Sequence, residues 1–245
     1  MNNLQALLSW FHSDPELRVK ARYALINRLA KRNGFRLASR RFSVYDDRPV
    51  RELFERGGYT FNDKKYMIYQ LALGVQTVPG HTAECGVFQG RGSYLILEAN
   101  LHSGKQHHIF DSFEGVSKPD DRDIHGHKHT KEWGQFDMAF PEESLRQRFQ
   151  SYQGVHYHKG WIPEKFHEVS NEKFSFVHID VDLYQPTYDS IAHFYPLLSP
   201  GGIILCDDYA ADGTPGARKA MDEFFADKPE NVVCTVPGSG FIIKQ

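Results

Sequence analysis

The chain has 245 residues, of which 40% are apolar and 24% charged, and its formal net charge is −2. This composition is typical of a soluble globular protein and gives no overall sign of nucleic-acid binding. The three cysteines lack metal-ligand spacing, and the sequence contains no secretory leader and no apolar run of about 18 residues. We therefore expect a cytoplasmic protein with reduced thiols and no transmembrane segment.

The first part of the chain is strongly basic. Between Leu17 and Arg41 there are nine lysines or arginines and no acid, and apolar residues recur there at helical spacing. One interpretation is an accessory helix with a solvated basic face; the other is docking to anionic lipid, a polyanionic substrate or a partner. We expect residues 1–57 to form this helical accessory segment and residues 58–245 to form a second domain.

From about residue 62 the patterns predict helices and strands in alternation. The expected helices cover 66–75, 93–101, 141–152, 187–197 and 215–225. The expected strands cover 82–87, 107–111, 155–158, 174–180, 203–207, 232–236 and 240–244, with a turn at 200–202. This alternation predicts an α/β fold with a mostly parallel sheet, helices on both faces and a final antiparallel hairpin.

A glycine-rich turn follows the first predicted strand and begins a helix, in Glu84-Cys-Gly-Val-Phe-Gln-Gly-Arg-Gly-Ser93. Glycines there let the backbone approach a ligand closely. Asp111 ends the next predicted strand, 21 residues after Gly90, at a position where nucleotide-binding folds hold a ribose diol. Glu84 before the first glycine suits a cofactor with a positively charged amino group, such as S-adenosylmethionine. The alternative is a turn that only packs the helix on the strand.

Two pairs of carboxylates end two later apolar runs: Asp180 with Asp182, and Asp207 with Asp208. Parallel sheets gather such residues at the carboxyl ends of their strands, where the four charges would repel one another. A hard cation such as Mg²⁺, or a basic partner, would offset this repulsion. The alternative roles are those of helix caps or turn residues.

Three other features carry open interpretations. The segment 120–136 contains His125, His127, His129 and Trp133, which suit either a transition-metal site or a long loop over an active site. His178 lies within a predicted strand and is interpreted as a hydrogen-bonded core residue. Trp161 follows the strand 155–158 and forms either an aromatic wall for an adenine ring or a packing contact.

Taken together, these motifs resemble a known family. The motifs, in chain order, are Glu84-x-Gly86-x-x-x-Gly90, Asp111-Ser-Phe-Glu-Gly115, His178-Ile-Asp-Val-Asp-Leu-Tyr184, Leu198-Ser-Pro-Gly-Gly202 and Asp207-Asp-Tyr209. From residue 58 to residue 244 the chain resembles the macrocin O-methyltransferase family. The resemblance implies a Rossmann-like class I methyltransferase with a seven-stranded sheet, S-adenosylmethionine as methyl donor, Mg²⁺ and a sugar hydroxyl as acceptor.

The resemblance also implies roles for individual residues. The metal ligands would be Asp180, Asp207 and Asp208, and the general base would be Asp182. Contacts to the cofactor would come from Glu84, Gly86, Gly90, Ser93, Asp111, Ser112, Trp161 and Asp180. The chain departs from the family pattern at Val181, where a glycine is usual, and at 89–92, which often reads Arg-Gly-Gly.

The leading hypothesis is therefore a Mg²⁺-dependent O-methyltransferase acting on a sugar or glycosylated acceptor. A catechol-type small-molecule methyltransferase is an alternative within the same fold, because a vicinal diol on either ring would chelate the cation. A non-catalytic nucleotide-binding module is the alternative from another class. We expect a small-molecule or glycan partner and no nucleic acid, and we leave open peripheral membrane contact and homo-oligomerisation.

Overall fold

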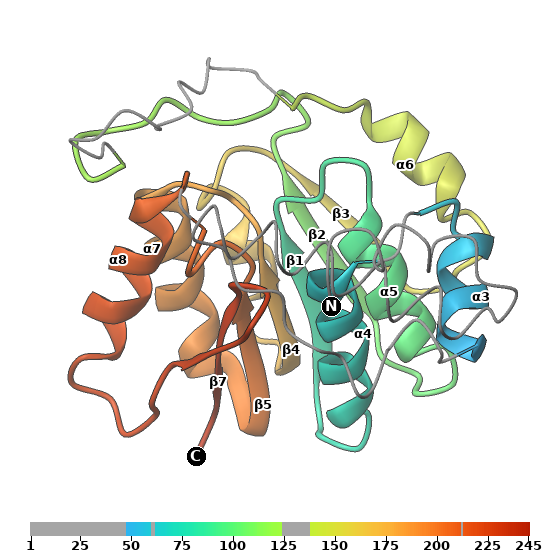
Figure 1. The fold of residues 1–245 in the computed structure, drawn as a ribbon. Helices are drawn as coiled ribbons and strands as arrows, with labels where there is room; N and C mark the ends of the chain where they lie inside the picture. The colour runs from blue at the N-terminus through green and yellow to red at the C-terminus, as the bar shows by residue number, and fades with distance from the viewer. Residues whose placement is uncertain (1–47, 60–61, 124–137, 212) are drawn as a thin grey trace, which may run out of the picture. The chain divides into compact units, whose positions relative to one another are not determined.

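The computed structural model describes residues 48–59, 62–123, 138–211 and 213–245. Residues Val50–Gln245 form one compact unit. Its strands are β1 (His81–Cys85), β2 (His107–Asp111), β3 (Val155–Lys159), β4 (Phe174–Ile179), β5 (Leu198–Cys206), β6 (Val233–Cys234) and β7 (Gly240–Ile243). They form one seven-stranded sheet in the order β3-β2-β1-β4-β5-β7-β6 (Figure 1).

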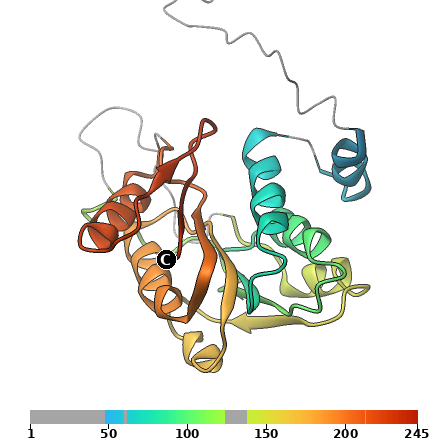
Figure 2. The same cartoon turned by 90° about the horizontal axis from the view of Figure 1, so that it is seen from below.

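The helices cover both faces of this sheet (Figures 1 and 2). They are α3 (Arg48–Arg56), α4 (Asp63–Gly74), α5 (Arg91–Ala99), α6 (Glu142–Arg148), α7 (Tyr184–Phe194) and α8 (Pro215–Phe225), with short 3₁₀ turns η3 (Phe166–Val169) and η4 (Tyr195–Leu197). Because adjacent strand residues face opposite sides, Phe176 packs in the core beside α3, α4, α5 and α6, whereas Val177 packs in the core beside α7 and α8.

The topology confirms the predicted class of fold. Strands β1 to β5 pair in parallel, whereas β7 pairs antiparallel with both β5 and β6. The chain winds outward from β1 through β2 to β3, then returns to β4 on the other side of β1. Ligands of open α/β sheets bind where the strand order reverses in this way, at the carboxyl ends of the strands.

The helices and strands predicted from residue 62 onward are present, but several boundaries differ. The turn expected at 200–202 is wrong, because these residues lie within β5. Phe174 pairs with Leu198 while Phe176 pairs with Ile203, so β5 carries extra residues as a bulge, and Gly201 within it has a φ of +82°. The helix expected at 141–152 ends at Arg148, and the helix expected at 187–197 begins earlier, at Tyr184.

The sequence analysis predicted a protein without a transmembrane segment. Within the described residues, no helix has the length and apolarity that crossing a bilayer requires. The basic segment between Leu17 and Arg41 and the three histidines of the segment 120–136 lie outside the described residues. The domain boundary after residue 57, the cytoplasmic location, the membrane contact and the oligomeric state all stay predictions.

Candidate active site

A cavity of about 540 Å³ opens at the carboxyl ends of the strands. Its walls come from the turn after β1, the segment after β2, the turn after β3 and the segment after β4. Six residues that the sequence analysis selected line it: Gly86, Asp111, Ser112, Trp161, Asp180 and Asp182. The tertiary structure thus brings most of the selected residues to one cavity at the predicted edge of the sheet.

Backbone amides hold the Asp111 carboxylate in place at the end of β2. Its Oδ2 accepts hydrogen bonds from Val87 N at 2.6 Å and Phe88 N at 3.4 Å, and its Oδ1 accepts one from Phe113 N at 2.6 Å. Burial raises the pKa of Asp111, and these amide donors oppose the rise. The carboxylate is therefore oriented before any ligand arrives and has acceptor capacity left for a diol.

Two positions of the glycine turn require glycine for steric reasons. Gly86 has a φ of +81°, and a Cβ there would lie 2.1 Å from the carbonyl oxygen of Asp180. Gly90 has a φ of +78° and forms the N-cap of α5, where a Cβ would meet Leu145 and Phe149 at 2.7 Å. Gly86 thus lets the end of β1 approach the loop after β4, and both segments border the cavity.

Glu84 and Ser93, which were expected to contact the cofactor, lie in a buried polar chain. Ser93 Oγ donates a hydrogen bond to Glu84, and Glu84 Oε1 lies 2.7 Å from Nδ1 of His178. On the far side of Ser93, His107 Nε2 lies 2.9 Å from its Oγ. The described residues that line the cavity do not include Glu84 or Ser93. A direct cofactor contact by either side chain stays a prediction.

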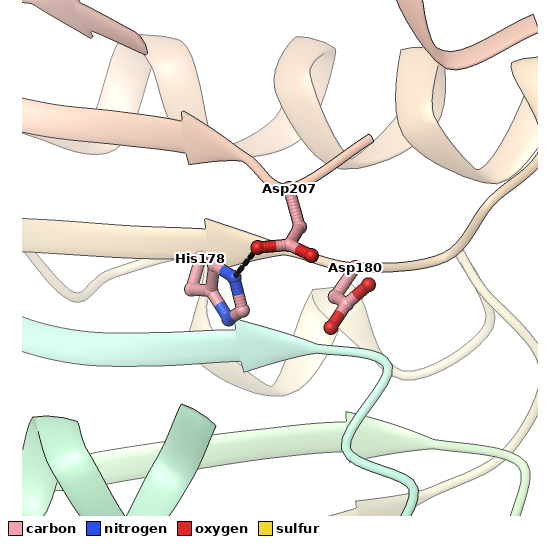
Figure 3. Close-up of side chains that lie close together, drawn as sticks. All are labelled: His178, Asp180 and Asp207. Atoms are coloured by element: carbon pink, nitrogen blue, oxygen red, sulfur yellow. Dashed lines mark ion pairs between the residues drawn. The ribbon is translucent and has the colours of Figure 1, made fainter. Parts of the chain in front are cut away.

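His178 is a buried, hydrogen-bonded residue of β4, as interpreted from the sequence. Burial alone would lower its pKa, but Asp207 and Glu84 raise the pKa of His178 to about 9. Its Nε2 lies 3.7 Å from Asp207 Oδ1, an ion-pair distance that is longer than a hydrogen bond (Figure 3). In the absence of a metal ion, Asp207 and Glu84 thus favour the protonated form of His178.

Three potential metal ligands converge beside the cavity. One atom each of His178, Asp180 and Asp207 lies within 4.8 Å of the others, and Figure 3 shows these side chains at the ends of neighbouring strands. The structure thus groups His178 with two of the three aspartates that the resemblance implied. Asp208 follows directly and is also buried.

The carboxylate oxygens fit a hard cation. Within the described residues, Asp207 Oδ1 and Asp208 Oδ2 are buried and have no hydrogen-bond partner. Burial and the charges of Asp180, Asp182 and Asp207 raise the pKa of Asp208 well above its ordinary value. Carboxylate oxygens that accept no hydrogen bond are suitable donors for Mg²⁺, which prefers oxygen ligands.

Two lysines at the start of α4 also contact these carboxylates, and the sequence analysis did not select them. Lys64 Nζ lies 3.2 Å from Asp207 Oδ2, and Lys65 Nζ lies 3.4 Å from Asp180 Oδ2. Burial alone would lower the pKa of Lys65, but Asp180 and Asp207 hold that pKa above its ordinary value. The sequence analysis left open that a basic partner offsets the repulsion among the acids. Lys64 and Lys65 are such partners, although they lie more than 100 residues before the aspartates in the chain.

Asp182 lies in the loop after β4, where it has an unusual backbone. Its φ is +60°, in the left-handed region, and the following Leu183 N donates to Val181 O at 2.6 Å. The predicted strand 174–180 included Asp180, but β4 ends at Ile179. A tight turn, and not strand alternation, brings both to the cavity wall. Strain of this kind concentrates at functional sites.

The sheet order, the terminal antiparallel hairpin and the cavity at the strand ends define the fold of a class I methyltransferase. The chain is similar in structure to the calicheamicin methyltransferase CalS11, with a TM-score of 0.62 and 20% identity over 99% of this chain and 97% of that one. It is also similar to the O-methyltransferase NovP, with a TM-score of 0.60 and 24% identity over 74% of this chain and 79% of that one. At these identities the likeness shows the fold.

The sequence itself gives the family. The family described as Macrocin-O-methyltransferase (TylF) matches residues 32–232, which is most of the chain, and the protein belongs to this family. The match begins at residue 32, whereas the resemblance was expected to begin at residue 58. It therefore includes part of the segment that was expected to stand apart.

Characterised relatives carry more specific names. The chain is 31% identical over 160 residues to 8-demethyl-8-(2,3-dimethoxy-alpha-L-rhamnosyl)-tetracenomycin-C 4'-O-methyltransferase of Streptomyces olivaceus, covering 60% of this chain and 58% of that protein. It is 29% identical over 164 residues to demethyldecarbamoylnovobiocin O-methyltransferase of Streptomyces niveus, covering 61% and 59%. The matched stretch thus spans about three fifths of these relatives.

Proposed function

We propose that this protein is an O-methyltransferase that transfers a methyl group from S-adenosylmethionine to a hydroxyl of a sugar or glycosylated acceptor, with a divalent cation, Mg²⁺, at the aspartates. The observation that carries the proposal is the position of Asp180. This residue lines the 540 Å³ cavity and also belongs to the carboxylate group beside it. A cofactor cavity and a cation site with a common wall are what metal-assisted methyl transfer requires.

The cavity walls supply the contacts for the nucleoside part of the donor. Asp111, oriented by three backbone amides, would accept hydrogen bonds from the ribose hydroxyls. Trp161 lines the cavity after β3 and would form a wall for the adenine ring. Gly86 would let the backbone approach the methionine part. An O-methyltransferase of the same fold from Bacillus cereus, with a TM-score of 0.50, was solved in complex with S-adenosylhomocysteine.

The aspartates Asp180, Asp207 and Asp208 would hold the cation. When bound, a divalent cation lowers the pKa of a coordinated hydroxyl and helps to orient it. The remaining work belongs to the chain: positioning the acceptor oxygen in line with the methyl carbon and excluding water. Asp207 Oδ1 and Asp208 Oδ2 support this assignment, because these buried oxygens accept no hydrogen bond within the described residues.

Asp182 would act as the general base. It lines the cavity next to Asp180 and is 9% exposed, so a carboxylate is held at the wall where the acceptor must lie. Asp182 would take the hydroxyl proton as the acceptor oxygen bonds to the methyl carbon. The electron pair of the broken carbon–sulfur bond would leave on the sulfur of S-adenosylhomocysteine.

The first test is thermal stability with S-adenosylhomocysteine, with and without Mg²⁺, against NADH and ATP. A ligand that binds only the native state must raise the melting temperature. We expect a rise with S-adenosylhomocysteine alone among the nucleotides, and a loss of that rise in Asp111→Ala but not in Asp227→Asn, whose side chain is 78% exposed. The absence of a shift at saturating ligand would favour the non-catalytic module and end the methyltransferase proposal.

The acceptor is tested by transfer of a labelled methyl group to a panel of nucleotide-activated deoxysugars, glycosylated aromatics and simple catechols. We expect product only with the sugar-bearing compounds and only with Mg²⁺ present. Asp207→Ala should abolish transfer while S-adenosylhomocysteine still raises the melting temperature. Transfer confined to the catechols would replace the proposed acceptor class, and full turnover by Asp207→Ala would remove the metal assignment.

A further inference from the structure

The first turn of α4 delivers two ammonium groups to the carboxylate cluster, which we define as Asp180, Asp182, Asp207 and Asp208. Lys64 Nζ lies 3.2 Å from Asp207 Oδ2 and 3.8 Å from Asp208 Oδ1. Lys65 Nζ lies 3.4 Å from Asp180 Oδ2 and 4.0 Å from Asp207 Oδ2. Asp180, Asp207 and Asp208 are therefore within ion-pair distance of Lys64 or Lys65.

These ion pairs lie in a partly desolvated place. The side chains of Lys64 and Lys65 are 26% and 16% exposed, and those of Asp207 and Asp208 are 8% and 11% exposed. Exposed ion pairs contribute little, but a charge that is buried without a partner is strongly destabilising. The two ammonium groups thus offset much of the repulsion among the acids.

The start of α4 is built to hold the lysines in place. Asn62 is the N-cap of the helix, and its side chain accepts a hydrogen bond from Lys65 N at 2.8 Å. Neighbouring helix residues point about 100° apart. Because both side chains are long and the cluster lies beside the first turn, the two ammonium groups reach Asp180, Asp207 and Asp208 from one helix.

A divalent cation held by these aspartates would lie close to the oxygens that the lysines contact. Asp207 Oδ2 is shared by both lysines, and Asp180 Oδ2 is occupied by Lys65. A divalent cation near these oxygens would be repelled by the two ammonium groups, which together carry a charge of +2. Binding of a cation would therefore weaken the ion pairs that Lys64 and Lys65 make with the acids.

We propose that Lys64 and Lys65 are the resident counter-ions of the carboxylate cluster, and that a divalent cation binds there only in competition with their ammonium groups. This inference rests on the proposed function, because it assumes that the cluster is the cation site. It adds that the lysines set the affinity for the cation and stabilise the cluster when the cation is absent.

The experiment uses the full chain and measures two quantities that do not depend on turnover. One is the dissociation constant for Mn²⁺, followed by electron paramagnetic resonance, with Mg²⁺ as competitor. The other is the melting temperature in EDTA and in Mg²⁺. The variants are Lys64→Gln, Lys65→Gln and the double variant, with Lys64→Arg and Lys65→Arg to retain the charge. The matched control is Lys173→Gln. Lys173 is exposed and lies just before β4, at the opposite edge of the sheet from the carboxylate cluster.

We expect the double glutamine variant to bind Mn²⁺ about tenfold more tightly, or better, than the unchanged protein. Its melting temperature in EDTA should fall by several degrees, and Mg²⁺ should restore it. The arginine variants and Lys173→Gln should stay close to the unchanged protein in both measurements. Should the double variant fail to fold in EDTA, the two single glutamine variants decide by the same comparison.

The other outcomes separate this inference from the proposed function. Equal Mn²⁺ affinity in the unchanged protein and in the glutamine variants would overturn the inference and leave the cation site intact. Binding by the glutamine variants alone would support the inference and remove the cation from the mechanism of the natural chain. Binding by none of the proteins would overturn both.

Discussion

Glu84 and His178 are register partners on the adjacent parallel strands β1 and β4, and their side chains meet at 2.7 Å in the sheet interior. His178 is 0% exposed and reaches toward Asp207 on its other side. His178 therefore joins the carboxylate that precedes the glycine turn to a carboxylate of the candidate cation site. The two halves of the candidate active site are held together through the core and not only through their loops.

Replacing His178 with glutamine should destabilise the fold strongly. Glutamine cannot carry the positive charge, so Glu84 and Asp207 would be left buried with less compensation. Removing one partner of a buried ion pair costs about 3–5 kcal/mol. We expect a loss of that size in the free energy of unfolding, measured by urea denaturation.

The matched control is His167→Gln, which changes an exposed histidine of η3 whose Nδ1 lies 2.8 Å from the Glu164 carbonyl oxygen. Its free energy of unfolding should change by less than about 1 kcal/mol. Similar losses in the two variants would show that His178 contributes packing alone, and that the ion pairs on either side of it carry little energy.

Stability should be greatest near pH 6.5, because the buried His178 titrates in the opposite direction to the buried His107 and His108. The pKa of His178 is raised to about 9, so its stabilising proton is fully present below its unfolded pKa of about 6.5 and is lost as the pH rises through 9. Burial and neighbouring histidines lower the pKa of His107 to about 3 and the pKa of His108 to about 3. The unfolded state therefore binds more protons than the native state below pH 6.5.

The expected slopes are about 1.4 kcal/mol per pH unit for each histidine, falling from pH 6.5 toward 5 and from pH 7 toward 9. Urea denaturation across this range measures them. His178→Gln should flatten the alkaline limb and leave the acid limb in place. An alkaline limb that is equally steep in this variant would contradict the assignment of the proton to His178.

Alanine at Gly86 should disrupt the candidate cofactor cavity. Its Cβ would stand 2.1 Å from the Asp180 carbonyl oxygen, so the loop after β4 would have to move. Gly104 provides the matched control, because its φ of +72° resembles that of Gly86 but no atom lies within 4 Å of its Cβ position. Gly104→Ala should therefore cost only the left-handed backbone, about 1–2 kcal/mol.

Binding of S-adenosylhomocysteine, measured by calorimetry, separates the two glycine variants. We expect Gly86→Ala to lose more than tenfold in affinity, or to lose the fold altogether, and Gly104→Ala to bind as the unchanged protein does. Equal affinity in both variants would mean that the approach of β1 to the loop after β4 is not needed for the cofactor.

Asp182→Asn should reduce the rate of methyl transfer while sparing the donor. The amide fits the same space but cannot take the acceptor proton, and loss of a general base costs about 10²–10⁴-fold in rate. Single-turnover transfer to an acceptor found in the panel measures the rate, and calorimetry with S-adenosylhomocysteine measures donor binding. A rate within a few-fold of normal would assign proton removal to another group.

The sequence by itself determined the class of fold and the family. Alternating apolar runs and glycine turns are local patterns, so β2 and α8 begin and end where they were expected. The acids at the strand ends were also visible, because parallel strands place their carboxyl ends at one edge. The bulge in β5 could not be predicted, because the Pro-Gly-Gly within it has the local sequence pattern of a turn.

Only the tertiary structure decided which charges meet. Lys64 and Lys65 lie in the first turn of α4, in a sequence with no unusual feature. No local pattern relates these lysines to Asp180 and Asp207, which follow more than 100 residues later. Glu84 reads as a cofactor contact, yet strand register places it against His178. Strand pairing and helix docking act between distant segments, so the counter-ions of a buried charge depend on the packing of the whole sheet and not on sequence spacing.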